Sequence, residues 1–305
     1  MSRRQARDGA GPALPSPLVS ARWLLERLGA DDLLVVDASV VSYTQPNGAP
    51  GSLSGHEQYI AEGHVPGAVF ADLIDDFSDP EGRYPFTRPD AARFAAAAGA
   101  IGLGPDTTVV VYDTALGQWA SRFWWLLRAF GHDAAAVLDG GLAAWRAVGG
   151  RVEVGHVEPI ATAFRAVERP EVWADKAEVE RVVAGEVQAA LVCSIPPKEF
   201  TGEIPASRAR QGVIPGSRSL PAGRLVDRDT RTALPDEQLR ALFAPILEAP
   251  RIVTYCNGGI AAAAAALQLV RIGETDVAVY DGSLNEWAAD PDAPLVTAQS
   301  GALTG

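Results

Sequence analysis

The sequence contains the same three markers twice, in the same order. Residues 63–68 (GHVPGA) recur as 212–217 (GVIPGS), 109–113 (VVVYD) as 252–256 (IVTYC), and 137–145 (VLDGGLAAW) as 279–287 (VYDGSLNEW). Three markers in one order at nearly one offset indicate a duplicated domain. The middle marker ends on Asp113 in the first copy and on Cys256 in the second. Because a thiolate is the stronger nucleophile, the second copy is expected to carry the chemistry.

Length and composition limit the class of protein. A chain of 305 residues is long enough for two cores. The formal net charge of −12 argues against nucleic acid as a partner, which requires a basic face. No apolar run is long enough to predict a membrane span. Two cysteines are too few for a disulfide framework, which favours the reducing cytoplasm.

Strand-like and helix-like segments alternate in both copies. Apolar runs such as 33–37, 109–112, 190–193 and 252–255 fit buried strands, and helical patterns separate them. This alternation predicts an α/β protein with two tandem domains, each a mostly parallel sheet with helices on both faces. We expect a disordered tail over 1–17, a first domain over 18–150, a linker over 151–172 and a second domain over 173–300.

Cys256 stands where a predicted strand ends and a predicted helix begins. Ligands bind at the carboxyl ends of strands in open α/β sheets. Gly258 and Gly259 allow the loop to curl so that backbone N–H groups point inward, and the helix adds the positive end of its dipole. We therefore expect the thiol to be a thiolate near neutral pH. The competing interpretation is that Cys256 is a small buried apolar residue, as free cysteines usually are.

Taken together, the paired 63–68 and 212–217 motifs, the Cys-x-x-Gly loop, the closing 279–287 motif and the segment 123–132 resemble the two-domain rhodanese family. The similarity extends from about Pro17 to Val296. It implies tandem rhodanese-like domains, a non-catalytic first copy, and a catalytic second copy whose site lies at the cleft between them. It also implies a sulfurtransferase that acts on thiosulfate or 3-mercaptopyruvate without a metal or organic cofactor. Because the duplication already supplies both sides of the cleft, we expect a monomer.

The mechanism implied by the resemblance has two steps. The Cys256 thiolate takes the outer sulfur of the donor and forms a persulfide, which then passes that sulfur to a thiol or to cyanide. Backbone N–H groups would hold the charge of the persulfide in the manner of an oxyanion hole. The residues expected to donate them are Asn257, Gly258, Gly259, Ile260 and Ala261.

Two other functions use the same loop. Cysteine-dependent phosphatases have a Cys-x5-Arg loop, and the arginine position is Ala262 here, which counts against that activity. A non-catalytic sulfur carrier or interaction module is the third alternative, and the intact cysteine and glycines argue against it.

The loop matches neither known donor type of the family. Thiosulfate-specific relatives have Arg-Lys after the cysteine and mercaptopyruvate-specific relatives have Gly-Ser, whereas this chain has Asn257-Gly258. Two arginines hold the carboxylate in mercaptopyruvate relatives. Their positions are Arg208, a candidate substrate-binding residue, and Glu199, a reversal of charge. The alternative to substrate binding is that Arg208 is a solvated arginine of a surface loop.

Two further residues are candidates for the site. The resemblance places Trp119 in the loop after Asp113, across the cleft from Cys256, either as an apolar wall for the donor or as interface packing. Cys193 ends the strand expected beside the Cys256 strand. We hypothesise that Cys193 accepts sulfur or forms a disulfide with Cys256 on oxidation; the alternative is a buried small residue.

Overall fold

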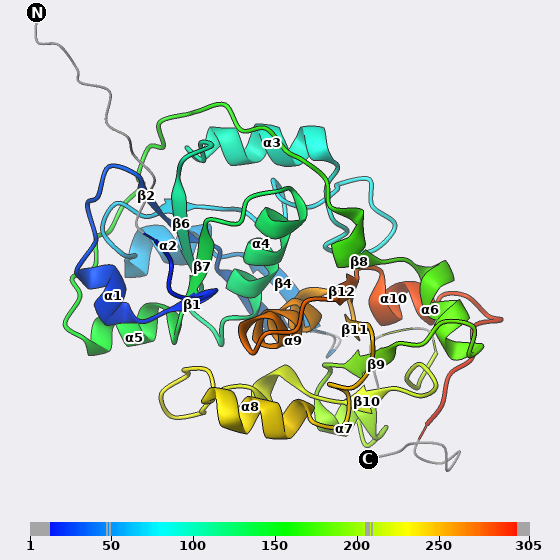
Figure 1. The fold of residues 1–305 in the computed structure, drawn as a ribbon. Helices are drawn as coiled ribbons and strands as arrows, with labels where there is room; N and C mark the ends of the chain where they lie inside the picture. Colours follow the sequence, from blue (N-terminus) through cyan, green and yellow to red (C-terminus); the bar gives the residue numbers. More distant parts are fainter. Residues whose placement is uncertain (1–12, 47, 49, 205–207, 209, 298–305) are drawn as a thin grey trace, which may run out of the picture.

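The computed structural model describes residues 13–46, 48, 50–204, 208 and 210–297 of the chain. The two copies form neighbouring halves of the molecule, with the blue-to-green segments in one and the green-to-red segments in the other (Figure 1). Most of the predicted tail, residues 1–12, and positions 298–300 of the predicted second domain lie outside the described residues. Within the described part, residues 13–17 lead directly into the first strand.

Each half contains one five-stranded parallel sheet, which confirms the predicted α/β class. The first sheet has the order β1 (Leu18–Val19), β7 (Ala135–Leu138), β6 (Thr108–Tyr112), β2 (Leu33–Asp37), β5 (Val69–Phe70). The second has the order β8 (Trp173–Ala174), β12 (Val277–Tyr280), β11 (Ile252–Tyr255), β9 (Ala190–Cys193), β10 (Arg218–Ser219). The two orders correspond strand for strand, as a duplication requires.

Helices cover both sheets. The first copy carries α1 (Ala21–Leu25), α2 (His56–Glu62), α3 (Ala91–Ala100), α4 (Gln118–Ala129) and α5 (Gly141–Ala147). The second carries α6 (Lys176–Val183), α7 (Pro197–Phe200), α8 (Asp236–Phe243), α9 (Ile260–Arg271) and α10 (Ser283–Trp287), with short 3-10 turns η1 (Pro170–Val172) and η2 (Ala222–Arg224). Successive residues of β6 enter different apolar clusters, because side chains alternate along a strand and both faces are covered.

The two halves meet along α4 and α9, which lie side by side at the centre of Figure 1. Large buried side chains of α4, including Trp119 and Phe123, belong to the same apolar cluster as the alanines of α9. Ala262, Ala263, Ala265 and Ala266 are fully buried. Their small size lets a helix rich in aromatic residues approach closely, so one continuous core runs through both copies.

The segment predicted as a linker follows the surface of the first copy. Glu153 exchanges backbone hydrogen bonds with His64, and the N–H groups of Thr162 and Val167 donate to Gly99 and Phe130. The segment then enters η1 and the second sheet. The first copy also contains an antiparallel hairpin of β3 (Val40–Thr44) and β4 (Pro50–Ser54), which was not predicted.

Candidate active site

Cys256 lies at the carboxyl end of a central parallel strand, as predicted. β11 ends at Tyr255, and α9 begins at Ile260. Gly259 is the N-cap of that helix and has a φ of 81°, a left-handed conformation that favours glycine. Cys256 itself is 4% exposed, so its side chain is almost completely covered.

The backbone of the Cys256 loop, residues 256–261, presents unused donors. Within the described part of the chain, no hydrogen-bond partner is found for the N–H groups of the five residues predicted to hold a persulfide: Asn257, Gly258, Gly259, Ile260 and Ala261. Gly259 is buried and the other four residues are half-buried, and the first N–H groups of a helix have no partner within the helix itself. Consecutive free donors at a helix start are typical of an anion-binding site.

The first copy has the same arrangement with a carboxyl group in place of the thiol. Asp113 follows β6 as Cys256 follows β11, and Gly117 caps α4 with a φ of 80°. The Asp113 carboxylate accepts hydrogen bonds of 2.9–3.0 Å from the N–H groups of Ala115, Gly117, Trp119 and Ala120. Burial raises the pKa of Asp113, and these four donors act in the opposite direction. The loop geometry of this fold therefore surrounds a buried carboxyl group with backbone donors, which oppose the effect of burial on its pKa.

The turn after β12 holds the outer side of the Cys256 loop. Ser283 Oγ accepts a hydrogen bond of 3.2 Å from the Cys256 N–H and donates one of 2.7 Å to Tyr280 O. The N–H groups of Leu284 and Asn285 donate, each at 3.0 Å, to the carbonyls of Cys256 and Asn257. The carbonyl side of the loop is thus tied down, which leaves the N–H groups as its free face.

Arg208 lies at the loop but is neutralised by Glu199. Arg208 Nη1 is 2.5 Å from Glu199 Oε1 and donates at 2.6 Å to Asn257 Oδ1, while Nη2 donates to Gly212 O. The two side chains are 7% and 11% exposed, so Arg208 is not the solvated residue of the alternative interpretation. The carboxylate of Glu199, which stands where relatives have an arginine, therefore forms an ion pair with Arg208, the residue expected to bind substrate.

Trp119 lies in the helix and not in the loop, which corrects the predicted location. It is the second residue of α4, is 8% exposed, and packs on Phe86 with ring centroids 5.0 Å apart. The helix starts early because Gly117 caps it one residue before Gln118.

Residues of the first copy reach the Cys256 loop. The carbonyl of Pro85, beside Phe86, lies 3.4 Å from where a Cβ on Gly258 would be.

Cys193 is paired with Tyr255 across β9 and β11, one residue from Cys256. It is fully buried, and burial raises the pKa of its thiol to about 12. Both cysteines are free thiols, so the hypothesised disulfide is not formed in this structure. Acceptance of sulfur by Cys193 stays a prediction.

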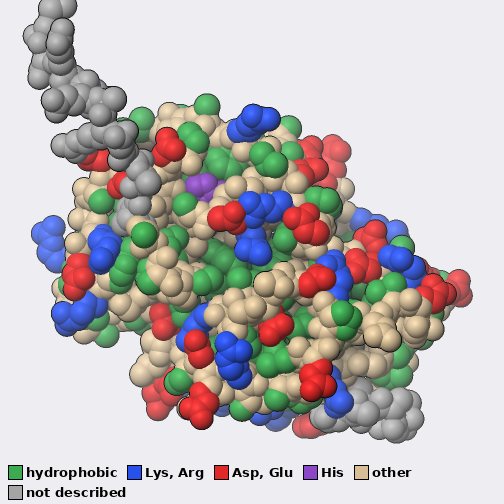
Figure 2. All heavy atoms as spheres, in the orientation of Figure 1, with side chains coloured by type: hydrophobic (Ala, Val, Ile, Leu, Met, Phe, Trp, Pro, Cys, Tyr) green, Lys and Arg blue, Asp and Glu red, His purple; other side chains and the backbone are tan. Residues whose placement is uncertain are grey.

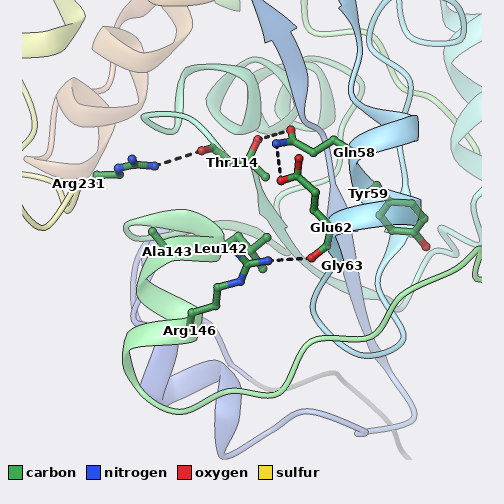
Figure 3. A pocket seen from close by; sticks show the side chains of 9 residues that line it. All are labelled: Gln58, Tyr59, Glu62, Gly63, Thr114, Leu142, Ala143, Arg146 and Arg231. Atoms are coloured by element: carbon green, nitrogen blue, oxygen red, sulfur yellow. Dashed lines mark hydrogen bonds between the residues drawn. The ribbon is translucent and has the colours of Figure 1, made fainter.

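A cavity of about 130 Å³ marks the corresponding place in the first copy (Figure 3). Thr114, next to Asp113, donates to Gln58 at 3.2 Å, and Arg231 reaches Thr114 O from the second copy. Figure 3 shows Glu62 and Arg146 closing the other side, from α2 and α5. In the first copy the residue equivalent to Cys256 is Asp113, whose carboxylate is already bonded by its own loop. This cavity therefore has no thiol at the position of Cys256.

Two residues at the site were missed. Arg122 was passed over inside an apolar helix, although a charged residue among tryptophans was a signal. Ser283 replaces Gly141 in the repeated turn, and both have positive φ, 48° and 55°. Only glycine fits in the first copy, because a Cβ on Gly141 would lie 2.3 Å from Asp113 O. The change between the two copies was therefore visible in the sequence.

The outer surface carries charges of both signs. Acidic and basic side chains are interspersed on the face shown in Figure 2. Among the described residues, none of the helices is long and apolar enough to cross a bilayer. No group of three or more His, Cys, Asp and Glu in that part of the chain is arranged to hold a metal ion.

Comparison with known proteins supports the resemblance. The Rhodanese-like domain family matches residues 20–148 and 191–290. Thiosulfate/3-mercaptopyruvate sulfurtransferase 1 of Arabidopsis thaliana is 34% identical over 93% of this chain and 79% of its own. The 3-mercaptopyruvate sulfurtransferase of Escherichia coli K12 is 33% identical over 91% of this chain and 96% of its own.

Solved structures agree with the sequence comparison. The crystal structure of SseA from Escherichia coli, described as a 3-mercaptopyruvate sulfotransferase with the rhodanese fold, superimposes with a TM-score of 0.77. It is 30% identical and covers 88% of this chain and 98% of its own. Tum1 from Saccharomyces cerevisiae, 22% identical with a TM-score of 0.79 over 92% of this chain and 98% of its own, shares the fold. With both halves matched and relatives aligned over almost its full length, the chain belongs to the rhodanese family.

Proposed function

We propose that the protein is a sulfurtransferase in which Cys256 carries the transferred sulfur. The observation that supports this most directly is the contrast between the two loops. In the first copy the loop N–H groups are used by Asp113, whereas in the second the equivalent donors are unused beside a thiol. A charged sulfur on Cys256 would give those donors an acceptor, as a developing oxyanion does in acyl transfer.

The proposed reaction has two balanced steps. The Cys256 thiolate attacks the outer sulfur of the donor, a new S–S bond forms, and the bond to the donor breaks. Sulfite leaves if the donor is thiosulfate, and the enolate of pyruvate leaves if it is 3-mercaptopyruvate. The acceptor thiolate or cyanide then attacks the terminal sulfur of the persulfide and regenerates the Cys256 thiolate. Each step conserves charge, so no external oxidant or reductant is needed.

Charge around the loop favours 3-mercaptopyruvate over thiosulfate as the donor. The loop residues 256–261 contain no cation, and the nearby Arg208 is paired with Glu199. A doubly charged donor gains little from a neutral pair, while a singly charged carboxylate loses less on leaving water. Phosphatase activity is not supported, because the position of its arginine is the fully buried Ala262.

The proposal extends to the setting of the enzyme. One chain already supplies both sides of the interface at Cys256, since first-copy residues contact Gly258 and Gly259. We therefore propose a monomer. Two free cysteines fit the reducing cytoplasm as its compartment. Small-molecule donors and thiol or cyanide acceptors are the expected partners. Because Cys256 is only 4% exposed, we propose that side chains around the loop move aside to admit them.

The test is a donor comparison on one enzyme preparation. kcat/KM is measured with thiosulfate and with 3-mercaptopyruvate, with cyanide as the common acceptor, for the wild type and for Cys256→Ser. We expect transfer with 3-mercaptopyruvate to exceed transfer with thiosulfate, and both to vanish in the folded serine variant. Equal activity of the serine variant would refute the role of Cys256, and a preference for thiosulfate would refute the donor assignment alone.

A further inference from the structure

A buried guanidinium of the first copy sits against the Cys256 loop of the second. Arg122 lies on α4 and is 2% exposed. Its Nη2 is 2.6 Å from Asp281 Oδ1 and donates at 2.8 Å to Phe86 O, and its guanidinium carbon is 5.3 Å from the centre of the Trp173 ring. A buried charge is costly unless it is paired and hydrogen-bonded, and these contacts satisfy only one side of the group.

The other side of the guanidinium points at the loop. Nη1 is buried and has no hydrogen-bond partner among the described residues. A Cβ atom placed on Gly259 would lie 2.9 Å from Nη1. Gly259 is the left-handed residue at which the loop turns into α9. A cationic donor without a partner among the described residues therefore lies against Gly259, one of the five loop residues whose N–H groups also have no partner there.

Arg122 also holds the turn that grips the loop. Asp281, its ion-pair partner, begins the turn whose residues Ser283, Leu284 and Asn285 bond the backbone of Cys256 and Asn257. The second oxygen of Asp281 accepts the Arg88 N–H at 2.8 Å. The first copy thus fixes the loop twice, by direct approach to Gly259 and through Asp281.

The duplicated architecture shows that this cation is not a requirement of the fold. α4 and α9 are both 12 residues long, and the residue of α9 equivalent to Arg122 is Ala264. Asp139, the equivalent of Asp281, accepts the Ala233 N–H at 2.7 Å just as Asp281 accepts that of Arg88. Within the described residues, Asp139 forms no ion pair. Among the described residues, only the cysteine copy pairs the aspartate of this turn with a guanidinium, because Arg231, which enters the first copy, reaches the carbonyl of Thr114 and not Asp139.

We infer that Arg122 is a positioning residue supplied by the first copy, which fixes the Cys256 loop and contributes positive potential that favours a negative sulfur there. The inference rests on the proposed function for its role in turnover. It also gives the non-catalytic copy a part in the reaction, because the loop itself contains no cation. The sulfur anion is the chemical species that Arg122 would stabilise.

Two variants with opposite charge changes test the electrostatic part. The rate of iodoacetamide alkylation of Cys256 is measured against pH. Arg122→Gln leaves Asp281 unpaired, so the midpoint of the profile should rise by about one pH unit. Asp281→Asn leaves Arg122 unpaired and should lower the midpoint. The charged and titratable groups nearest the loop, which stay constant, are Glu199, Arg208, Arg88 and Cys193.

A purely structural role predicts a different pattern. If Arg122 only braced the interface, both variants would loosen the loop and shift the midpoint in the same direction or not at all, and that result would overturn the inference. Arg122→Lys retains the charge without the planar group, so its midpoint should stay near that of the wild type; a rise equal to that of Arg122→Gln would also count against the inference.

Arg251→Gln is the matched control for lost stability. Arg251 precedes the opposite end of β11 and ion-pairs at 2.6 Å with Glu178, away from the Cys256 loop. It should lower the melting temperature without moving the midpoint. For sulfur transfer, the kcat/KM of Arg122→Gln, normalised to the amount of folded enzyme, should be lower than that of the wild type by a factor on the order of ten to a hundred. If the wild type transfers no sulfur, the proposed function fails, while the alkylation profiles still decide the role of Arg122.

Discussion

Asp113 and Cys256 immediately follow equivalent strands, but of the two, within the described residues, only Asp113 has its side chain bonded by the N–H groups of its own loop. The loops differ by one residue between the strand and the capping glycine, at 117 and 259. The first copy therefore serves as an internal reference for how the loop binds an acceptor group at this position. It shows that the backbone donors of the loop surround a buried carboxyl group and oppose the effect of burial on its pKa.

Replacing the thiol with a carboxylate should stabilise the second copy while abolishing transfer. In Cys256→Asp the new carboxylate can accept bonds from loop donors that now have no partner, whereas Cys256→Ser offers a neutral group of similar size. We expect the free energy of unfolding of the aspartate variant to exceed that of the serine variant by roughly 1 to 2 kcal/mol at pH 7. Urea denaturation of both measures this. An aspartate variant less stable than the serine variant would show that the loop does not stabilise anions.

Gly259→Ala should cost more than the strain of a left-handed alanine alone. The φ of Gly259 is 81°, and its added methyl would meet Arg122 Nη1 at 2.9 Å. Gly29 has a φ of 91° and nothing within 4 Å of an added methyl, so Gly29→Ala is the matched control. We expect a loss of about 1 kcal/mol in the control, and a larger loss with strongly reduced transfer in Gly259→Ala. Thermal unfolding and kcat/KM together give the comparison; equal losses in both variants would contradict the close approach of Arg122.

Removing the Glu199 carboxylate should favour anionic donors. In Glu199→Gln, Arg208 Nη1 keeps Asn257 Oδ1 as a partner but loses its counter-charge. An anionic donor can then interact with an uncompensated guanidinium, so kcat/KM should rise on the order of tenfold. Thiosulfate, with two charges, should gain more than 3-mercaptopyruvate. The control is Glu203→Gln, an exposed residue that bonds only Thr201 among the described residues. Lower kcat/KM with both donors would mean that Glu199 supports the loop instead of masking Arg208.

The buried Asp37 should make stability depend on pH in the acid range. Burial raises its pKa from 3.8 to about 6, against hydrogen bonds from Ser39 and Tyr112, and Asp113 raises it further. Because the raised value favours the protonated form in the folded state, its contribution is fully present below pH 3.8 and is lost as pH rises to about 6. The loss amounts to roughly 2 to 3 kcal/mol.

Asp37→Asn supplies the measurement for that prediction. The neutral amide should remove this part of the pH dependence and make the variant more stable than the wild type at pH 7, with little difference at pH 4. The difference in unfolding free energy between the two proteins, followed by urea denaturation from pH 4 to pH 7, isolates Asp37 from other carboxylates. A constant difference across that range would contradict the shifted titration.

Much of the fold could be predicted from the sequence because the decisive segments are short apolar runs with clear ends. The strands at 33–37, 190–193 and 252–255 were predicted with the bounds that the structure has. The hairpin of β3 and β4 was missed because half of its strand residues are exposed, only Val40 is buried, and the sequence shows no apolar alternation there. Trp119 was misplaced because the loop after Asp113 was expected to include it, whereas Gly117 caps the helix and Trp119 lies in its first turn.

The site was partly predictable for the same physical reason. The order strand, cysteine, two glycines and helix determines a loop by local geometry, so Cys256 and its donors could be identified from neighbours in the chain. The pairs Arg208–Glu199 and Arg122–Asp281 depend on how distant segments dock. No local pattern encodes docking, although the tryptophan-rich context of Arg122 and the change from Gly141 to Ser283 were visible signals.

The most direct measurement of the account is the mass of the cysteine peptides after incubation with a sulfur donor and rapid alkylation. We expect one added sulfur atom on the Cys256 peptide, its disappearance when cyanide is added, and no added sulfur on the Cys193 peptide, whose thiol has a pKa raised by burial to about 12. Transfer that proceeds with no sulfur on Cys256, or with sulfur held first on Cys193, would contradict it.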